Sequence, residues 1–127
     1  MKRCGMTRWI ISALLGGALG VTTLAWAHGD AGTPELVTGE VVDLACYIDH
    51  GAKGAGHLGC ASHCIASGLP VGIKSGDIIY LAIGNEHQTA NATLAPFASQ
   101  QVVVEGTVTE RDGVRLIEIT KVTAKKA

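Results

Sequence analysis

Apolar and polar residues alternate along several short segments of the chain, and this alternation predicts strands. The most regular segments are residues 101–110 and 114–123, which an Arg-Asp-Gly turn joins into a hairpin. Residues 71–74 and 78–83 are shorter apolar runs around a Ser-Gly-Asp turn and predict a second hairpin. A fifth strand is expected over residues 36–44, where β-branched residues are frequent although the alternation is imperfect.

Three segments between the predicted strands have a different character. Residues 51–59 contain too many glycines for the interior of a helix or strand and predict a flexible loop. Residues 60–67 predict a short helix that ends at Gly68, and residues 91–99 predict a short helix or turn covering one end of the sheet. Five strands in about 90 residues indicate a mostly β fold, a small five-stranded antiparallel OB-like barrel with one short cysteine-bearing helix.

The amino-terminal segment differs in composition from the rest of the chain. Residues 1–27 place three basic residues ahead of an apolar run that ends in Ala-Trp-Ala, an arrangement typical of a secretory signal peptide. The expected mature chain begins at His28 and is periplasmic or secreted, with a flexible arm over residues 28–35 and the OB-like domain over residues 36–127. An uncleaved segment that anchors the protein in the membrane is the alternative, because the apolar run is just long enough to span a bilayer.

Removal of residues 1–27 also changes the charge of the chain. It removes three of the ten Lys and Arg residues and none of the eleven Asp and Glu residues, so the formal net charge falls from −1 to −4. A negative domain argues against nucleic acid as a partner, because nucleic-acid binding needs a basic surface. The exported domain would keep three cysteines, an odd number, so at least one sulfur is free, bound to a ligand or paired with another chain.

The residues able to do chemistry are concentrated in one short stretch. Residues 46–64 hold three of the four cysteines and three of the five histidines. Thiolate and imidazole donors together suit zinc or copper, and three sulfurs with one nitrogen form a familiar tetrahedral set. The predicted ligands are Cys46, His57, Cys60 and Cys64, with His63 or His50 as substitute ligands or as groups that support the ligands.

Other uses of the same cysteines remain open at this stage. A disulfide from Cys46 to Cys60 or Cys64 would hold the loop and helix against the first strand and contribute about 3 kcal/mol. A cysteine nucleophile with a histidine base is conceivable, but no acid partner can be identified. Covalent haem and a thioredoxin-type activity are disfavoured, because neither Cys-x-x-Cys-His nor Cys-x-x-Cys is present. A new amino terminus at His28 could chelate copper(II) through its amine and ring.

Two motifs also support a resemblance to other proteins. They read Gly39-Glu40-Val41-Val42-Asp43-x-x-Cys46-Tyr47 and His57-x-x-Cys60-Ala61-x-x-Cys64-Ile65-x-x-Gly68-x-Pro70. In them the chain resembles a family of small exported bacterial proteins that carry this cysteine pattern ahead of OB-like strands. The resemblance implies a fold and a compartment, and it implies no activity. The chain differs from such proteins at Leu58-Gly59, where they often have a basic residue after the histidine.

The sequence therefore favours a periplasmic protein that binds a transition metal, zinc or copper, for carriage or sensing. The alternative is a disulfide-stabilised module of the cell envelope that binds another protein without catalysis. The expected partners are a metal ion and a periplasmic or membrane protein. No catalytic residue and no small-molecule substrate is predicted.

The exported protein is expected to begin at His28, because the signal-peptide pattern ends at Ala27. Trp9 and Trp26 both lie in the leader, so the mature protein should also have almost no tryptophan absorbance. Intact mass measured on the exported protein tests this expectation. A mass that includes residues 1–27 would indicate a retained membrane anchor instead.

Overall fold

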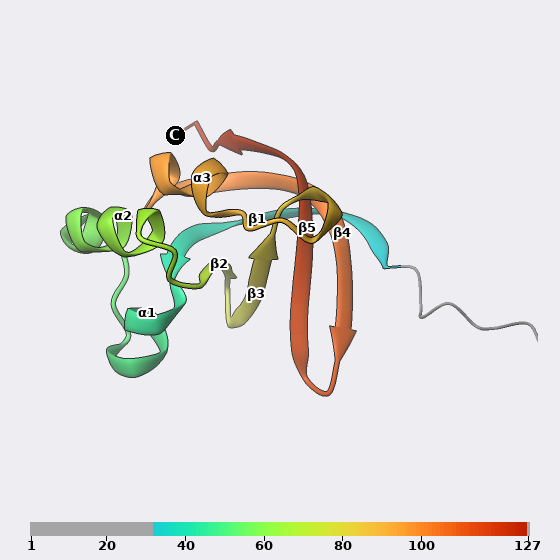
Figure 1. Cartoon of the computed structure of the whole chain (residues 1–127), viewed down its shortest axis with the longest axis horizontal. Coiled ribbons are helices and arrows are strands. Elements are labelled where there is room, and N and C mark those ends of the chain that lie inside the picture. Colours follow the sequence, from blue (N-terminus) through green and yellow to red (C-terminus); the bar gives the residue numbers. More distant parts are fainter. Residues whose placement is uncertain (1–31, 127) are drawn as a thin grey trace, which may run out of the picture.

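The strands of the computed structural model, which describes residues 32–126, close into a five-stranded barrel in the order β1-β2-β3-β5-β4 (Figure 1). Neighbouring strands are antiparallel except β3 and β5, which pair in parallel. This arrangement confirms the predicted mostly β, OB-like barrel. The strands are β1 (Thr33–Asp43), β2 (Val71–Ser75), β3 (Ile78–Ile83), β4 (Gln101–Arg111) and β5 (Val114–Ala124).

The predicted strands agree with the observed ones to within a few residues. The largest difference is at the start of β1, which begins at Thr33. Residues 33–35, expected in a flexible arm, are therefore paired with β4 in the barrel. The predicted leader and His28 lie outside the described residues. Among residues 32–126, no helix is long and apolar enough to cross a membrane.

The interior of the barrel is filled by branched aliphatic side chains that alternate along the strands. Val41, Ile73 and Ile117 are completely buried, and each such side chain contributes roughly 1.5–3 kcal/mol on leaving water. Helices α2 (Leu58–Ala66) and α3 (Asn91–Leu94) close one end of this core, because Ile65 and Leu94 are also completely buried there. The chain continues from α3 into a short 3-10 helix, η3 (Ala95–Phe97).

A hydrogen-bonded side chain holds the two closing helices together. Asn91 Nδ2 donates to the carbonyl oxygens of Ile65 and Leu69, each at 2.7 Å. Both acceptors lie at the end of α2 or just beyond it, where carbonyl groups lack partners within the helix. The amide therefore fixes the end of α2 relative to the start of α3.

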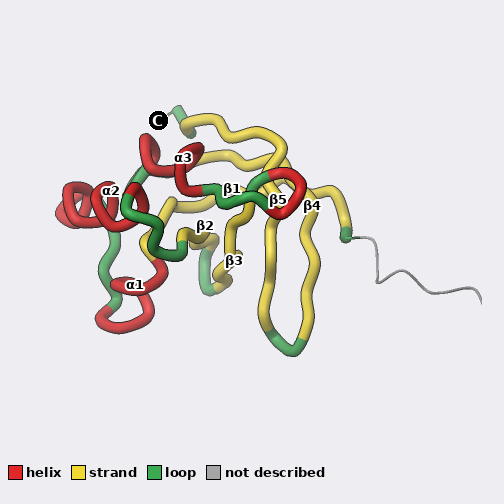
Figure 2. The backbone as a smooth tube through the Cα atoms, in the orientation of Figure 1, coloured by secondary structure: helices red, strands yellow, loops and turns green. Residues whose placement is uncertain are grey.

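Two further helical segments lie between β1 and β2, and a third follows β3. They are α1 (Leu44–His50), η1 (Ala55–His57) and η2 (Asn85–His87). Figure 2 shows α1 and α2 on the side of the strands away from the start of β1. Helix α1 was not predicted: the first strand was expected to end at Leu44 and a flexible loop to begin at Gly51. Asp43 caps its first turn, and Gly51 ends it with a left-handed φ of 71°.

Close approach of the strands requires glycine at Gly39. A Cβ atom added there would lie 2.4 Å from the carbonyl oxygen of Lys74 and 2.8 Å from Cγ2 of Ile73. Both contacts are far shorter than van der Waals distance, and one of them is to backbone. The pairing of β1 with β2 therefore requires a residue without a side chain at position 39.

We expect Gly39→Ala to lower the free energy of unfolding by about 1–3 kcal/mol, because the strands must separate to admit the methyl group. The matched control is Gly59→Ala in α2, where an added Cβ meets nothing within 4 Å. This control should be neutral or stabilising by up to about 1 kcal/mol, since alanine favours helix. Chemical denaturation of the reduced, metal-free proteins measures both changes. Equal stability of the two variants would contradict the steric argument.

Candidate metal centre

The cysteine and histidine side chains meet where β1 ends and α1 packs near α2. Cys46 is on α1, His57 ends η1, and Cys60 and Cys64 are one turn apart on α2. The donor atoms of Cys46, His57 and Cys60 lie within 4.8 Å of one another. All four predicted ligands thus come from adjacent segments inserted between β1 and β2.

The three sulfurs form a compact triangle. Cys60 Sγ and Cys64 Sγ are 3.9 Å apart, and Cys46 Sγ lies within 4.8 Å of each. A tetrahedral ion with metal–sulfur bonds of 2.3 Å needs sulfurs about 3.8 Å apart. Only small movements would therefore bring all three sulfurs onto one ion.

All three of these cysteines are free thiols. A disulfide bond joins two sulfurs about 2.05 Å apart, and no such bond links Cys46 to Cys60 or to Cys64. The disulfide considered as the alternative is thus not formed within the described part of the chain. Each of the three sulfurs is therefore available as a separate metal ligand.

The position of His57 depends on a tether between the glycine-rich loop and the barrel. Gly54 donates its backbone N–H to the side-chain Oε1 of Glu40 on β1. Gly54 has a φ of 76°, which favours glycine, and its carbonyl accepts the N–H of His57 at 2.9 Å. The loop is therefore anchored three residues before the histidine, and its last turn is fixed.

One ring nitrogen of His57 has no hydrogen-bond partner. The residue is half-buried, and its Nε2 is fully enclosed without a donor or acceptor. Leaving a buried polar atom unpaired costs about 1–3 kcal/mol. A metal ion bonded to Nε2 would remove that cost.

The other two histidines of the stretch do not join the group. His63 is exposed on α2 and belongs to neither set of close donor atoms. His50 is also exposed, and its Nδ1 lies 3.1 Å from the carboxylate of Asp49. The rings of His50 and His57 approach edge to face, with their centroids 6.4 Å apart. His50 is thus a neighbour of His57, while His63 faces solvent.

Asp43 is a site residue that the sequence reasoning missed. Its donor oxygen lies within 4.8 Å of Cys46 Sγ and Cys64 Sγ, and the residue is only 1% exposed. Oδ1 accepts a hydrogen bond from the backbone of Ala45 at 2.9 Å, whereas Oδ2 is buried and accepts none from an N–H or O–H group. The available signal was an aspartate directly before a possible helix, three residues ahead of Cys46.

The carboxylate and the thiols alter one another's protonation. Burial raises the pKa of Asp43, but hydrogen bonding from the Cys46 thiol and the Ala45 N–H outweighs burial, so its pKa is lowered overall. The hydrogen bond to Asp43, with burial, raises the pKa of Cys46 to about 12. Burial and then the Cys60 thiol raise the pKa of Cys64. Metal binding at neutral pH must therefore displace thiol protons.

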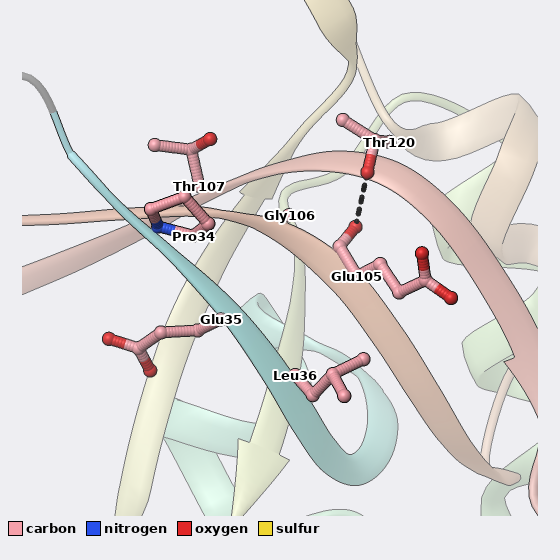
Figure 3. A pocket seen from close by; sticks show the side chains of 7 residues that line it. All are labelled: Pro34, Glu35, Leu36, Glu105, Gly106, Thr107 and Thr120. Atoms are coloured by element: carbon pink, nitrogen blue, oxygen red, sulfur yellow. Dashed lines mark hydrogen bonds between the residues drawn. The ribbon is translucent and has the colours of Figure 1, made fainter.

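An open groove of about 680 Å³ lies elsewhere, on β1, β4 and β5 (Figure 3). The residues of β1 that line it are at the start of that strand, whereas Asp43 is at its end. Thr120 Oγ1 donates to the carbonyl oxygen of Glu105 at its border, at 3.0 Å. Neither group of close metal-binding donor atoms includes a residue that lines the groove. Within residues 32–126, the candidate metal ligands therefore lie at the helical side of the barrel, away from this groove.

Comparisons with models of protein families, with curated proteins and with solved structures find no match to this chain. The resemblance to small exported bacterial proteins therefore stays a prediction.

The raised pKa of Cys46 should be visible in the reduced, metal-free protein. One thiol is expected to ionise near pH 12, and Asp43→Asn should lower that pKa towards the ordinary value of 9.0 by removing the charged acceptor. A raised pKa favours folding below the unfolded value, so this stabilisation is lost as the pH rises from about 9 to 12. Thiolate absorbance near 240 nm measures the titration.

The control is Asp49→Asn, which removes the same charge from the exposed side of α1. It should leave the titration unchanged. Identical curves for the wild type and both variants would contradict the role given to Asp43.

Proposed function

We propose that this is an exported protein that binds one transition-metal ion, zinc or copper, through Cys46, His57, Cys60 and Cys64. The observation that carries the proposal is the set of three free thiols no more than 4.8 Å apart, beside an imidazole nitrogen with no partner. Soft sulfur and nitrogen donors in this number suit zinc and copper better than magnesium or calcium. Binding joins α1 to α2 through the ion.

The uneven exposure of the ligands supports carriage or sensing over a purely structural role. Cys60 is exposed, whereas Cys46, His57 and Cys64 are half-buried. Structural zinc sites are usually closed on all sides. An exposed thiolate can be replaced by a ligand from another molecule while the remaining three donors hold the ion. The partner that exchanges metal in this way would be a periplasmic or membrane protein.

Metal should raise the melting temperature of the reduced wild type. At a free metal concentration of 100 times the dissociation constant, binding adds about 2.7 kcal/mol, which is roughly 10–20 °C for a domain of this size. Cys60→Ser, Cys64→Ser and His57→Ala should each remove most of that rise. His63→Ala is the matched control and should behave as the wild type, because His63 is exposed and outside both donor groups. Differential scanning fluorimetry with zinc or copper(I) measures the effect.

Each contrary result has a distinct meaning. A wild-type melting temperature that stays constant at metal concentrations well above micromolar would refute the proposal. A rise that persists in all three ligand variants would move the site to another part of the chain, such as His28. A single free thiol in the non-reduced, metal-free protein would favour the disulfide-stabilised binding module.

A further inference from the structure

Asp43 has an oxygen atom that the fold leaves without a partner. One carboxylate oxygen caps α1 through Ala45, and this bond fixes the orientation of the carboxylate. The other oxygen is buried and receives no N–H or O–H donor. Burial of a charged oxygen without such a donor is costly. A carboxylate oxygen of Asp43 also lies within 4.8 Å of the thiol sulfurs of Cys46 and Cys64. These are the sulfurs assigned above to the metal.

The sulfur triangle can therefore receive a fourth donor from either of two residues. His57 lies within 4.8 Å of Cys46 and Cys60, while Asp43 lies within 4.8 Å of Cys46 and Cys64. The histidine supplies nitrogen near the exposed cysteine, and the aspartate supplies oxygen near the buried side of the cluster. Both have an unpartnered buried atom. An ion among the sulfurs has a ready ligand on each side.

The chemistry of an oxygen donor distinguishes between the two metals. Zinc is a borderline ion that accepts carboxylate oxygen at about 2.0–2.2 Å, whereas copper(I) is soft and prefers thiolate and thioether. Charge acts in the same direction. The donors Asp43, Cys46 and Cys64 carry three negative charges when bound. A divalent ion neutralises two of these charges, whereas a monovalent ion neutralises only one. Uncompensated charge is costly at a buried carboxylate.

We propose, resting on the metal-binding function above, that Asp43 Oδ2 is a further ligand and makes the centre favour a divalent ion such as zinc over copper(I). The ligand set then joins the end of β1 directly to the ion. Because Oδ1 is already held by the helix cap, Oδ2 is presented to the ion with little loss of side-chain freedom. Asp43 thereby caps the start of α1 and also determines which metal ion the cluster prefers.

The test is the effect of Asp43→Asn on the affinities for zinc and copper(I), measured on the reduced protein by competition with chelators of each metal. Asparagine also caps helices well, so α1 should be retained. The ratio of zinc affinity to copper(I) affinity should fall about 10- to 100-fold, the range found when a group that supports a metal site is removed. The ratio is compared because the lower thiol pKa expected for Cys46 in this variant changes the affinity for both metals alike. Asp49→Asn, an exposed carboxylate on the same helix, should change neither affinity.

A fall of both affinities by the same factor would overturn the inference, because it would mean that Asp43 only supports the helix. A rise of both affinities by the same factor would overturn it as well. Failure of the wild type to bind either metal would instead refute the proposed function, so the two failures are distinguishable.

A measurement on the unsubstituted protein covers the case in which the variant folds poorly. Infrared spectra of protein labelled with ¹³C-aspartate should show one carboxylate band shifting when zinc binds, and no such shift with copper(I). Absence of a shift with zinc, or the same shift with both metals, would overturn the inference.

Discussion

The hydrogen bond from Ala45 to the side chain of Asp43 marks the point at which the barrel ends and the helices that carry the candidate metal ligands begin. At this residue the chain stops pairing with β2 and turns into α1. The N–H of Leu44 donates to the carbonyl of Pro70 at 2.9 Å, so the start of α1 is also tied to the residue that precedes β2. Without this turn, Cys46 would continue along the strand direction and would not meet the cysteines of α2.

The barrel was predictable because its strands repeat a simple pattern. In β4 the buried Val102, Val104 and Gly106 alternate with more exposed residues, and the glycine-containing turns separate the hairpins clearly. The seven residues of α1 carry no comparable pattern, since only Leu44 is buried. The evidence for that helix was at its ends, in Asp43 and Gly51, and these residues are equally compatible with a loop when read alone.

The candidate site was predictable only in part. Contacts between residues close in the sequence could be predicted, and contacts between separate segments could not. Cys60 and Cys64 meet because helix geometry places residues four apart on one face. Helix geometry leaves His63 at the margin of that face, about 100° from Cys64, and only the structure shows that it is exposed. The approach of Cys46 across a loop, and the unpartnered oxygen of Asp43, arise from tertiary packing. No local pattern in the sequence encodes them.

Helix α2 belongs to two parts of the molecule at once. Ile65 is locked into the barrel core, while Cys60 and Cys64 on the same helix are held towards α1. Helix α1 has a looser attachment, and Ile48 on it is 74% exposed. The cysteines of α2 are therefore attached to the barrel core, whereas Cys46 is on the less buried helix α1. If the sulfurs move closer together around an ion, α1 would move and the barrel core would not. Metal binding would then change the surface that α1 presents to solvent.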